Sequence, residues 1–280
     1  MKIGVIGSGT MGSGIAQVMA LCHDVVIRDI APEALKAAHA KIEKGYNRNV
    51  EKGRMSEEDA KAAIARLETT EDLNELKDCD IIIEAATENP TIKKGIFTEL
   101  AELCDEKTIL ASNTSSLSIT DIAAATNRPE KVIGMHFFNP VPVMKLVEVI
   151  CGLNTSDETK QFVVDLANEI GKTPVEVEEA PGFVVNRILI PMINEAVGIY
   201  ADGVASVEDI DNAMKLGANH PMGPLALGDL VGLDVVLAIM GVMYNDYHDS
   251  KYRAHVLLRK MVRGGKLGRK TGEGFYKYDK

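Results

Sequence analysis

The first 180 residues alternate between two patterns of apolar and polar positions. Short, continuous apolar runs are typical of buried parallel strands, and longer segments with apolar residues three or four apart are typical of amphipathic helices. The apolar runs cover residues 2–7, 25–29, 80–85, 108–111, 131–135, 145–150 and 173–177. The helical pattern follows residue 7 and recurs over residues 32–68, 91–104, 118–126 and 156–170. This alternation predicts an α/β fold of the Rossmann type, with a doubly wound parallel sheet.

The longest helical segment, residues 32–68, is rich in Ala, Lys and Glu and is interrupted near Gly53. Ser56 stands just after the interruption, with Asp59 three residues further on, a spacing typical of a helix N-cap. We therefore expect a pair of helices inserted into the sheet domain.

The strand pattern stops after Ala180-Pro181-Gly182, and the remaining chain has only helical patterns. These cover residues 183–201, 206–217, 224–247 and 251–263, separated by glycine and proline. The sequence thus predicts two domains, an α/β domain over residues 1–181 and an all-α domain over residues 182–280.

Composition and charge narrow the classes of function. The 280 residues carry 41 acidic and 31 basic side chains, a net charge of −10, so nucleic acid is not expected as a partner. The four cysteines lie far apart without disulfide or metal-ligand spacing, which indicates reduced structural thiols and no metal site. No apolar run reaches the roughly 18 residues of a membrane span. The chain enters a strand pattern at once, without a signal-peptide pattern, so we expect no membrane role and a cytoplasmic location.

A glycine-rich turn joins the first strand to the first helix. Gly7-Ser8-Gly9-Thr10-Met11-Gly12 has the spacing G-x-G-x-x-G, which brings backbone and a helix N-terminus close to a pyrophosphate. Asp29 ends the second strand, where a carboxylate can accept hydrogen bonds from the ribose of a dinucleotide. Asp29 favours NAD over NADP, although the neighbouring Arg28 could offset the charge of a 2′-phosphate. The alternative interpretation is a glycine-rich turn without a ligand.

A histidine and a glutamate are expected to face each other across a hairpin. His136 ends one apolar strand and Glu148 lies within the next, with Pro140 and Pro142 between them. A hairpin centred near residue 142 pairs residues whose numbers sum to about 284, which places His136 opposite Glu148. The carboxylate would orient the imidazole, leaving its other nitrogen to act as a general base. The alternatives are a core histidine and a solvent-facing glutamate.

Three further groups of polar residues invite a functional or a purely structural interpretation. The cluster from Ala111 to Ser116 follows a strand, where it could bind a ligand or merely cap the next helix. Asn186 is a polar amide near the start of an apolar helix and needs a partner. The inserted helices concentrate basic residues, which form either a solvated face or a docking site for coenzyme A phosphates. They are Lys41, Lys44, Arg48, Lys52 and Arg54.

Several strings of residues resemble the (S)-3-hydroxyacyl-CoA dehydrogenase family. The most specific are His136-Phe137-Phe138-Asn139-Pro140-Val141-Pro142-Val143-Met144-Lys145-Leu146-Val147-Glu148 and Pro181-Gly182-Phe183-Val184-Val185-Asn186-Arg187. The segment 111–117, His220-Pro221-Met222-Gly223-Pro224 and the terminal 268–276 also resemble this family, so the similarity spans the chain. It is strongest to free-standing bacterial members that have no attached hydratase or thiolase domain.

The resemblance implies a role for individual positions. It implies that His136 is the general base, that Glu148 orients it, and that Ser115 and Asn186 bind the reacting oxygen or the substrate. Lys52, with Arg48 nearby, is implied to lie near the coenzyme A phosphates. The implied dinucleotide contacts, beyond the glycine loop and Asp29, are Glu88, Lys93, Asn113, Asn139 and Lys270.

The resemblance also implies an activity. It implies an NAD-dependent dehydrogenase of fatty acid and butyrate metabolism that interconverts acetoacetyl-CoA and (S)-3-hydroxybutyryl-CoA, and a homodimer formed through the helical C-terminal domain. One alternative is a dehydrogenase of a free hydroxy acid such as gulonate, which would need no coenzyme A site. Another is a non-catalytic descendant, against which the intact set of Ser115, His136, Glu148 and Asn186 argues.

Overall fold

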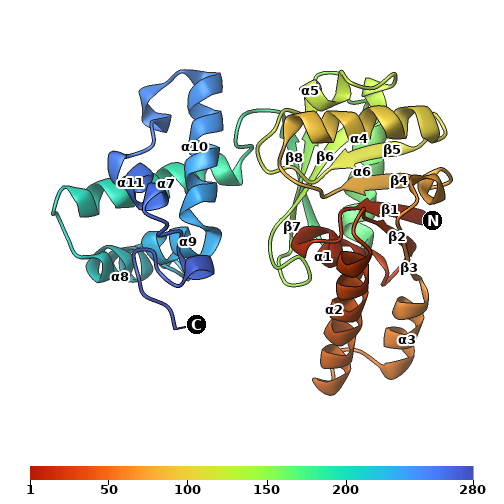
Figure 1. The fold of residues 1–280 in the computed structure, drawn as a ribbon, viewed down its shortest axis with the longest axis horizontal. Coiled ribbons are helices and arrows are strands. Elements are labelled where there is room, and N and C mark those ends of the chain that lie inside the picture. Colours follow the sequence, from red (N-terminus) through yellow and green to blue (C-terminus); the bar gives the residue numbers. More distant parts are fainter. Residues whose placement is uncertain (280) are drawn as a thin grey trace. The chain divides into compact units, whose positions relative to one another are not determined.

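A computed structural model describes residues 1–279. The chain forms two compact units, one from Met1 to Glu179 and one that begins at Ala180, drawn in Figure 1. The division falls two residues before the expected position after Pro181.

The first unit is built on one sheet of eight strands in the order β3-β2-β1-β4-β5-β6-β7-β8. All neighbouring strands are parallel except β6 and β7, which form an antiparallel pair. The strands are β1 (Lys2–Ile6), β2 (Asp24–Arg28), β3 (Leu67–Thr70), β4 (Ile81–Glu84), β5 (Ile109–Ser112), β6 (Val132–Phe137), β7 (Leu146–Cys151) and β8 (Thr173–Glu178). The predicted Rossmann-type fold is confirmed.

Helices enclose the sheet, so the central strands read as continuous apolar runs. Ile3 and Val5 of β1 and Ile81 and Ile83 of β4 have no exposed surface. The α-helices are α1 (Thr10–Met19), α2 (Pro32–Glu51), α3 (Glu57–Ala65), α4 (Pro90–Leu103), α5 (Ile119–Ala123) and α6 (Asp157–Glu169). Figure 1 shows α2 and α3 side by side as the inserted pair, and Ser56 caps α3 by accepting a hydrogen bond from the Asp59 amide.

Two local predictions in this unit are wrong. The chain from Leu67 to Thr70 is the edge strand β3, whereas we expected helix as far as residue 68. Only Leu67 of that strand is buried, so it lacks the apolar run by which the other strands are recognised. Helix α5 ends at Ala123 instead of residue 126, and the Thr126 hydroxyl donates to the Ala123 carbonyl just after it.

The second unit is all helical, as predicted, around its own apolar core. Its helices are α7 (Val185–Ala201), α8 (Val207–Gly217), α9 (Pro224–Val231), α10 (Leu233–Tyr247) and α11 (Val256–Arg263), with short 3-10 turns η3 (Ser250–Tyr252) and η4 (Arg269–Thr271). The expected single helix over 224–247 is wrong, because Gly232 adopts a φ of 102° that no helix contains, and α9 and α10 meet at 94°. The last helix begins later than expected, at Val256, where the His255 ring caps it.

Membrane-spanning potential is confined to that bent pair. Within residues 1–279 no single helix has the length and apolar character to cross a bilayer, and α9 with α10 meets the criterion only when the two are taken together. The four cysteines are free thiols, with Cys22 exposed and the other three buried.

Candidate functional site

The glycine loop lies at the carboxyl end of β1. Gly7 has a φ of 96°, and a Cβ on Gly12 would stand 1.8 Å from the Gly7 carbonyl oxygen, so only glycine fits at both positions. Gly9 is the N-cap of α1 and has no side chain to occupy the first-turn amides. This geometry is the one by which a helix N-terminus receives phosphate groups.

Asp29 is fixed across the same loop. Its Oδ2 accepts hydrogen bonds from the Ser8 amide at 2.7 Å and the Ser8 hydroxyl at 2.6 Å. Partial burial raises the pKa of Asp29, but the hydrogen bonds from Ser8 and Ala31 outweigh it, so the pKa lies below its usual value and the carboxylate is ionised. Arg28, the residue that could offset this charge, donates through Nε to the Glu71 carbonyl at 3.3 Å.

A cleft of about 570 Å³ opens beside this carboxylate. Its walls combine the glycine loop and Asp29 with apolar side chains, notably Ile30, Ile92 and Ile96. An elongated ligand with phosphates, a ribose and a flat apolar base matches that lining.

His136 and Glu148 form the predicted pair. In the antiparallel register of β6 and β7, His136 stands directly opposite Glu148, and Nδ1 lies 2.8 Å from Oε2. His136 is 6% exposed and Glu148 is fully buried, so the carboxylate is desolvated except for its partners. Because Nδ1 faces Glu148, Nε2 lies on the opposite side of the ring, as a general base requires.

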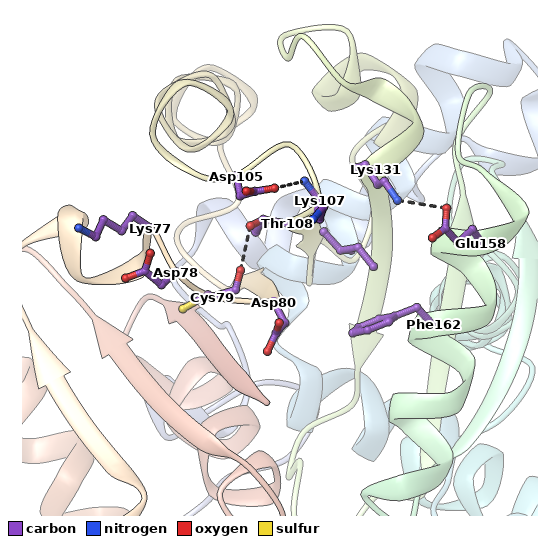
Figure 2. Close-up of a pocket in the computed structure, with 11 residues that line it drawn as sticks. Lys77, Asp78, Cys79, Asp80, Asp105, Lys107, Thr108, Lys131, Glu158 and Phe162 are labelled. Carbon is purple, nitrogen blue, oxygen red and sulfur yellow. Dashed lines mark hydrogen bonds and ion pairs between the residues drawn. The ribbon is translucent and has the colours of Figure 1, made fainter.

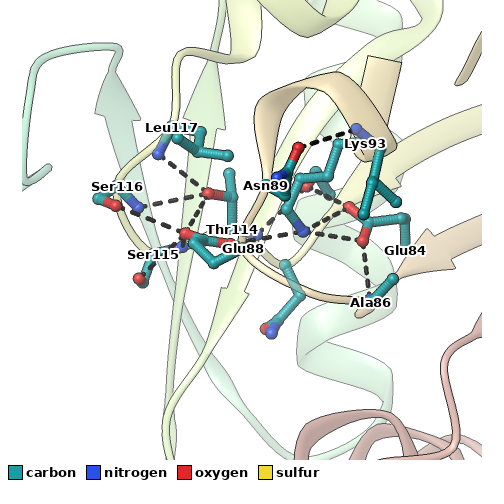
Figure 3. A network of polar contacts seen from close by, with 12 residues as sticks. Glu84, Ala86, Glu88, Asn89, Lys93, Thr114, Ser115, Ser116 and Leu117 are labelled. Carbon is teal, nitrogen blue, oxygen red and sulfur yellow. Dashed lines mark hydrogen bonds and ion pairs between the residues drawn. The ribbon is translucent and has the colours of Figure 1, made fainter. Parts of the chain in front are cut away.

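A polar network occupies the carboxyl ends of β4 and β5, as Figure 3 shows. Lys93 Nζ lies 2.8 Å from both carboxylate oxygens of Glu84 and 3.4 Å from Glu88 Oε2. Glu88 Oε1 accepts from the Thr114 hydroxyl at 2.6 Å and from the Ser115 amide at 2.9 Å. Burial raises the pKa of Glu88, but Lys93 and these hydrogen bonds outweigh it and hold that pKa below its usual value.

Sequence reasoning pointed to Glu88, Lys93 and Ser115 separately but missed Glu84. The only local signal for Glu84 is a carboxylate at the end of the apolar run Ile81-Ile82-Ile83. Its complete burial becomes visible only in the folded chain.

Two further side chains set the position of the hairpin. The Asn113 side-chain oxygen accepts a hydrogen bond from the Phe137 amide at 2.9 Å, which ties the end of β5 to the residue after His136. Lys172, which the sequence did not single out, donates through Nζ to the carbonyls of Val141 at 2.5 Å and Met144 at 2.8 Å. Both carbonyls belong to the loop that carries Asn139 and joins β6 to β7.

The inserted helices use their basic residues unequally. Lys41 Nζ donates to the Ser13 hydroxyl of α1 at 3.1 Å. Lys44 and Arg48 line a cavity of about 500 Å³ on α2. Lys52 lies one residue past the helix as its C-cap, and its amide donates to the Arg48 carbonyl.

Two predicted site residues belong to the second unit. Asn186 is 9% exposed in the first turn of α7. Lys270 lies in η4 and forms an ion pair with Asp234 of α10, with N–O distances of 2.5 and 2.6 Å. The tail beyond Lys270 is held by the buried Asp229, which accepts from the amides of Phe275 and Tyr276. Burial raises the pKa of Asp229 despite those hydrogen bonds.

A separate cavity of about 490 Å³, shown in Figure 2, lies at the amino ends of the strands. Asp80, Thr108 and Lys131, each next to the start of a strand, contribute to its wall. Lys131 pairs with Glu158 at 3.3 Å. None of the predicted site residues lines it, and its acidic and basic side chains are interspersed.

Comparison with known proteins covers the whole chain. The model of the 3-hydroxyacyl-CoA dehydrogenase NAD binding domain matches residues 2–180, and the model of the C-terminal domain of the same family matches residues 182–278. The chain is 61% identical to a 3-hydroxybutyryl-CoA dehydrogenase of Clostridioides difficile, over 100% of both chains. It is 54% identical to a probable 3-hydroxybutyryl-CoA dehydrogenase of Bacillus subtilis, over 99% of this chain and 97% of that protein.

Solved structures agree with the sequence relatives. The crystal structure of (S)-3-hydroxybutyryl-CoA dehydrogenase from Ralstonia eutropha superposes with a TM-score of 0.97 at 50% identity, covering 100% of this chain and 99% of that one. Both domains, their order and their full lengths are therefore matched, and the chain belongs to the 3-hydroxyacyl-CoA dehydrogenase family.

Proposed function

We propose that this protein is an NAD-dependent dehydrogenase that interconverts acetoacetyl-CoA and (S)-3-hydroxybutyryl-CoA. The observation that carries the proposal is the buried His136–Glu148 pair, built on the antiparallel strands β6 and β7 of an NAD-binding fold. The names of the relatives at 50–61% identity support this substrate, and they do not favour the alternative of a free hydroxy acid.

The ionised Asp29 and the glycine loop fit the cofactor. Asp29 would accept hydrogen bonds from the ribose hydroxyls of NAD. The phosphates would be held by the glycine loop, through Gly7, Gly9, Thr10, Met11 and Gly12. Bound NAD supplies the acceptor or donor of hydride. The negative charge at Asp29 disfavours a 2′-phosphate and so favours NAD over NADP.

The proton is handled by the chain itself. In the oxidation direction His136 Nε2 takes the proton of the C3 hydroxyl as hydride leaves C3, and the carbonyl forms. Glu148 holds the ring by Nδ1 and stabilises the imidazolium that results. We assign Ser115 and Asn186 to the hydrogen bonds that hold the reacting oxygen, and Glu88, Lys93, Asn113, Asn139 and Lys270 to the surroundings of the dinucleotide.

We assign the coenzyme A phosphates to the inserted helices. Arg48 and the neighbouring Lys52 place two positive charges at the C-terminal end of α2 in a protein of net charge −10. We also propose a homodimer formed through the helical unit, because that unit exposes large apolar side chains such as Ile188 at 69% and Val256 at 75%. The location that we propose is the cytoplasm.

Steady-state rates test the proposal directly. Acetoacetyl-CoA with NADH should turn over much faster than with NADPH, and His136→Gln should abolish most of the rate. Free coenzyme A should compete with the substrate. Turnover of gulonate without inhibition by coenzyme A would contradict the proposal and support the free hydroxy acid alternative.

A further inference from the structure

Glu84 is a fully buried carboxylate at the carboxyl end of β4. Its Oε1 accepts from the Ala86 amide at 2.7 Å, and its Oε2 accepts from the Ser112 hydroxyl at 2.8 Å. Lys93, which is 1% exposed, donates to both oxygens. Burying two charges this completely costs free energy that their attraction offsets only in good geometry, so the pair by itself adds little to stability.

Lys93 links Glu84 to the Ser115 segment. Its ammonium lies between two carboxylates, because it is also 3.4 Å from Glu88 Oε2. The other oxygen of Glu88 accepts from the Ser115 amide at 2.9 Å and lies 3.2 Å from the Ser115 hydroxyl. Figure 3 shows these contacts as one continuous chain from β4 to the segment after β5.

A second route joins the same ends through the backbone. The Ser112 hydroxyl, which donates to Glu84, accepts a hydrogen bond from the Thr114 amide at 3.2 Å. The Thr114 hydroxyl in turn donates to Glu88 at 2.6 Å. Glu84 therefore fixes both the cation that faces Glu88 and the turn that carries Ser115.

We propose that Glu84 is a positioning residue for Ser115, acting through Lys93 and Glu88. The proposal rests on the proposed function, in which Ser115 binds the reacting oxygen. Glu88 is 39% exposed, so its carboxylate can rotate into solvent unless something holds it. Glu84 holds Lys93 in place, and Lys93 in turn keeps the Glu88 carboxylate in the orientation that accepts the hydrogen bond from the Ser115 amide.

Removal of the Glu84 charge should change the position of Ser115. In Glu84→Gln the side chain keeps its shape, but the Lys93 ammonium loses its closer counter-charge and is drawn towards Glu88. The Glu88 carboxylate then turns from the Ser115 segment. We expect kcat with acetoacetyl-CoA to fall about 10- to 100-fold, the effect of disturbing one hydrogen bond to a charged group.

A double-mutant cycle separates positioning from a structural role. The four proteins are the wild type, Glu84→Gln, Ser115→Ala and the double variant, measured for kcat and KM with acetoacetyl-CoA and NADH. If Glu84 acts through Ser115, the double variant should have a kcat within about 3-fold of Ser115→Ala. Losses that multiply would show that Glu84 acts independently of Ser115 and would overturn the proposal, as would an unchanged kcat in Glu84→Gln.

Glu179→Gln is the matched control. Like Glu84, Glu179 belongs to the first unit and accepts hydrogen bonds from a backbone amide and a hydroxyl, in this case both of Thr120, but it lies outside the network. Its effect on kcat should multiply with that of Ser115→Ala. If Glu84→Gln fails to fold, Ser112→Ala provides a second test, because it removes one hydroxyl donor from Glu84. Its kcat should fall less, and the double variant with Ser115→Ala should again have nearly the kcat of Ser115→Ala alone. Losses of kcat that multiply in this pair would equally overturn the proposal.

Failure of the network and failure of the proposed function give different results. An active wild type with multiplying losses overturns only the positioning role of Glu84. A wild type without turnover of acetoacetyl-CoA overturns the proposed function, and the positioning role falls with it.

Discussion

Replacing Lys172 by methionine should loosen the loop between the two strands of the His136–Glu148 hairpin. Lys172 is 8% exposed, and its ammonium donates to the carbonyls of Val141 and Met144. Burial lowers the pKa of Lys172, and no charge within residues 1–279 offsets that shift. Burying the Lys172 ammonium costs desolvation free energy, and its hydrogen bonds to two backbone carbonyls offset that cost.

The expected loss of stability comes mainly from Val141. This residue is 2% exposed, so its carbonyl would lose a charged donor without gaining water, at a cost of about 1–3 kcal/mol. Met144 is 41% exposed, and its carbonyl can turn to solvent at little cost. Because about 1 kcal/mol lowers the Tm of a domain this size by about 2–4 °C, Lys172→Met should melt several degrees earlier.

The activity should fall further than the stability explains. Val141 packs against α1, since a Cβ on Gly14 would lie 2.9 Å from the Val141 Cβ. The loop therefore connects the glycine-loop helix to the hairpin that places His136 opposite Glu148. A small displacement of either group weakens alignment for hydride and proton transfer, so we expect kcat to fall about 10-fold at temperatures where the variant is folded.

Hydrogen exchange provides the direct assay. The amides of Val143 and Met144 both donate to the Pro140 carbonyl and should exchange faster in Lys172→Met. Lys160→Met is the control, because Lys160 lies on the neighbouring α6 and pairs with Asp157 and Glu176 at the surface, where little stability is at stake. If the two variants have the same exchange, Tm and kcat, Lys172 does not hold the loop.

Four other variants test the proposed site. His136→Gln should lower kcat by about 10²–10⁴-fold with NADH affinity retained in a fluorescence titration, and near-normal turnover would exclude His136 as the base. Glu148→Gln should lower kcat about 10- to 100-fold, because the imidazolium loses its neighbouring charge; an unchanged kcat would leave Glu148 a structural role. Asp29→Ser should narrow the preference for NADH over NADPH, measured as the ratio of kcat/KM values, by about 1–3 kcal/mol. A wild type that already prefers NADPH would contradict the role of Asp29. Arg48→Glu with Lys52→Glu should raise KM for acetoacetyl-CoA but not for NADH, and the effect should disappear with acetoacetyl-pantetheine, whereas equal losses on both substrates would indicate a disturbed fold.

The parts of the site that the sequence predicted are those governed by local rules. The hairpin register follows from the two prolines near its centre, and the structure pairs His136 with Glu148 as the sum of about 284 requires. The glycine loop likewise depends on steric constraints within a few residues, as the 1.8 Å approach at Gly12 illustrates. Short-range geometry of this kind requires the same residue types at the same spacing, so a sequence motif reveals it.

The elements that were missed depend on partners far along the chain. Strand β3 exists because β2 offers an open edge, although only Leu67 of β3 is buried. The elbow at Gly232 lies in an apolar stretch whose periodicity continues across it, and only the positive φ of that glycine reveals the break. In both cases a local pattern favoured helix, and tertiary contacts decided the outcome.

Buried charges escaped sequence reasoning for a related reason. Glu84 follows an apolar run and Lys172 stands between Gly171 and Thr173. Both are satisfied by groups from other elements, Glu84 by the Ser112 hydroxyl and Lys172 by the Val141 carbonyl. A hydropathy pattern predicts that such a residue is exposed to solvent, because charged side chains are seldom buried without a partner. The partner here is distant in the sequence, so the pattern does not reveal it. In a sheet enclosed on both faces, however, a charge at the end of an apolar strand has little access to solvent. A glutamate in that position, as at Glu84, therefore indicates a built polar network at the carboxyl edge, where this fold places its chemistry.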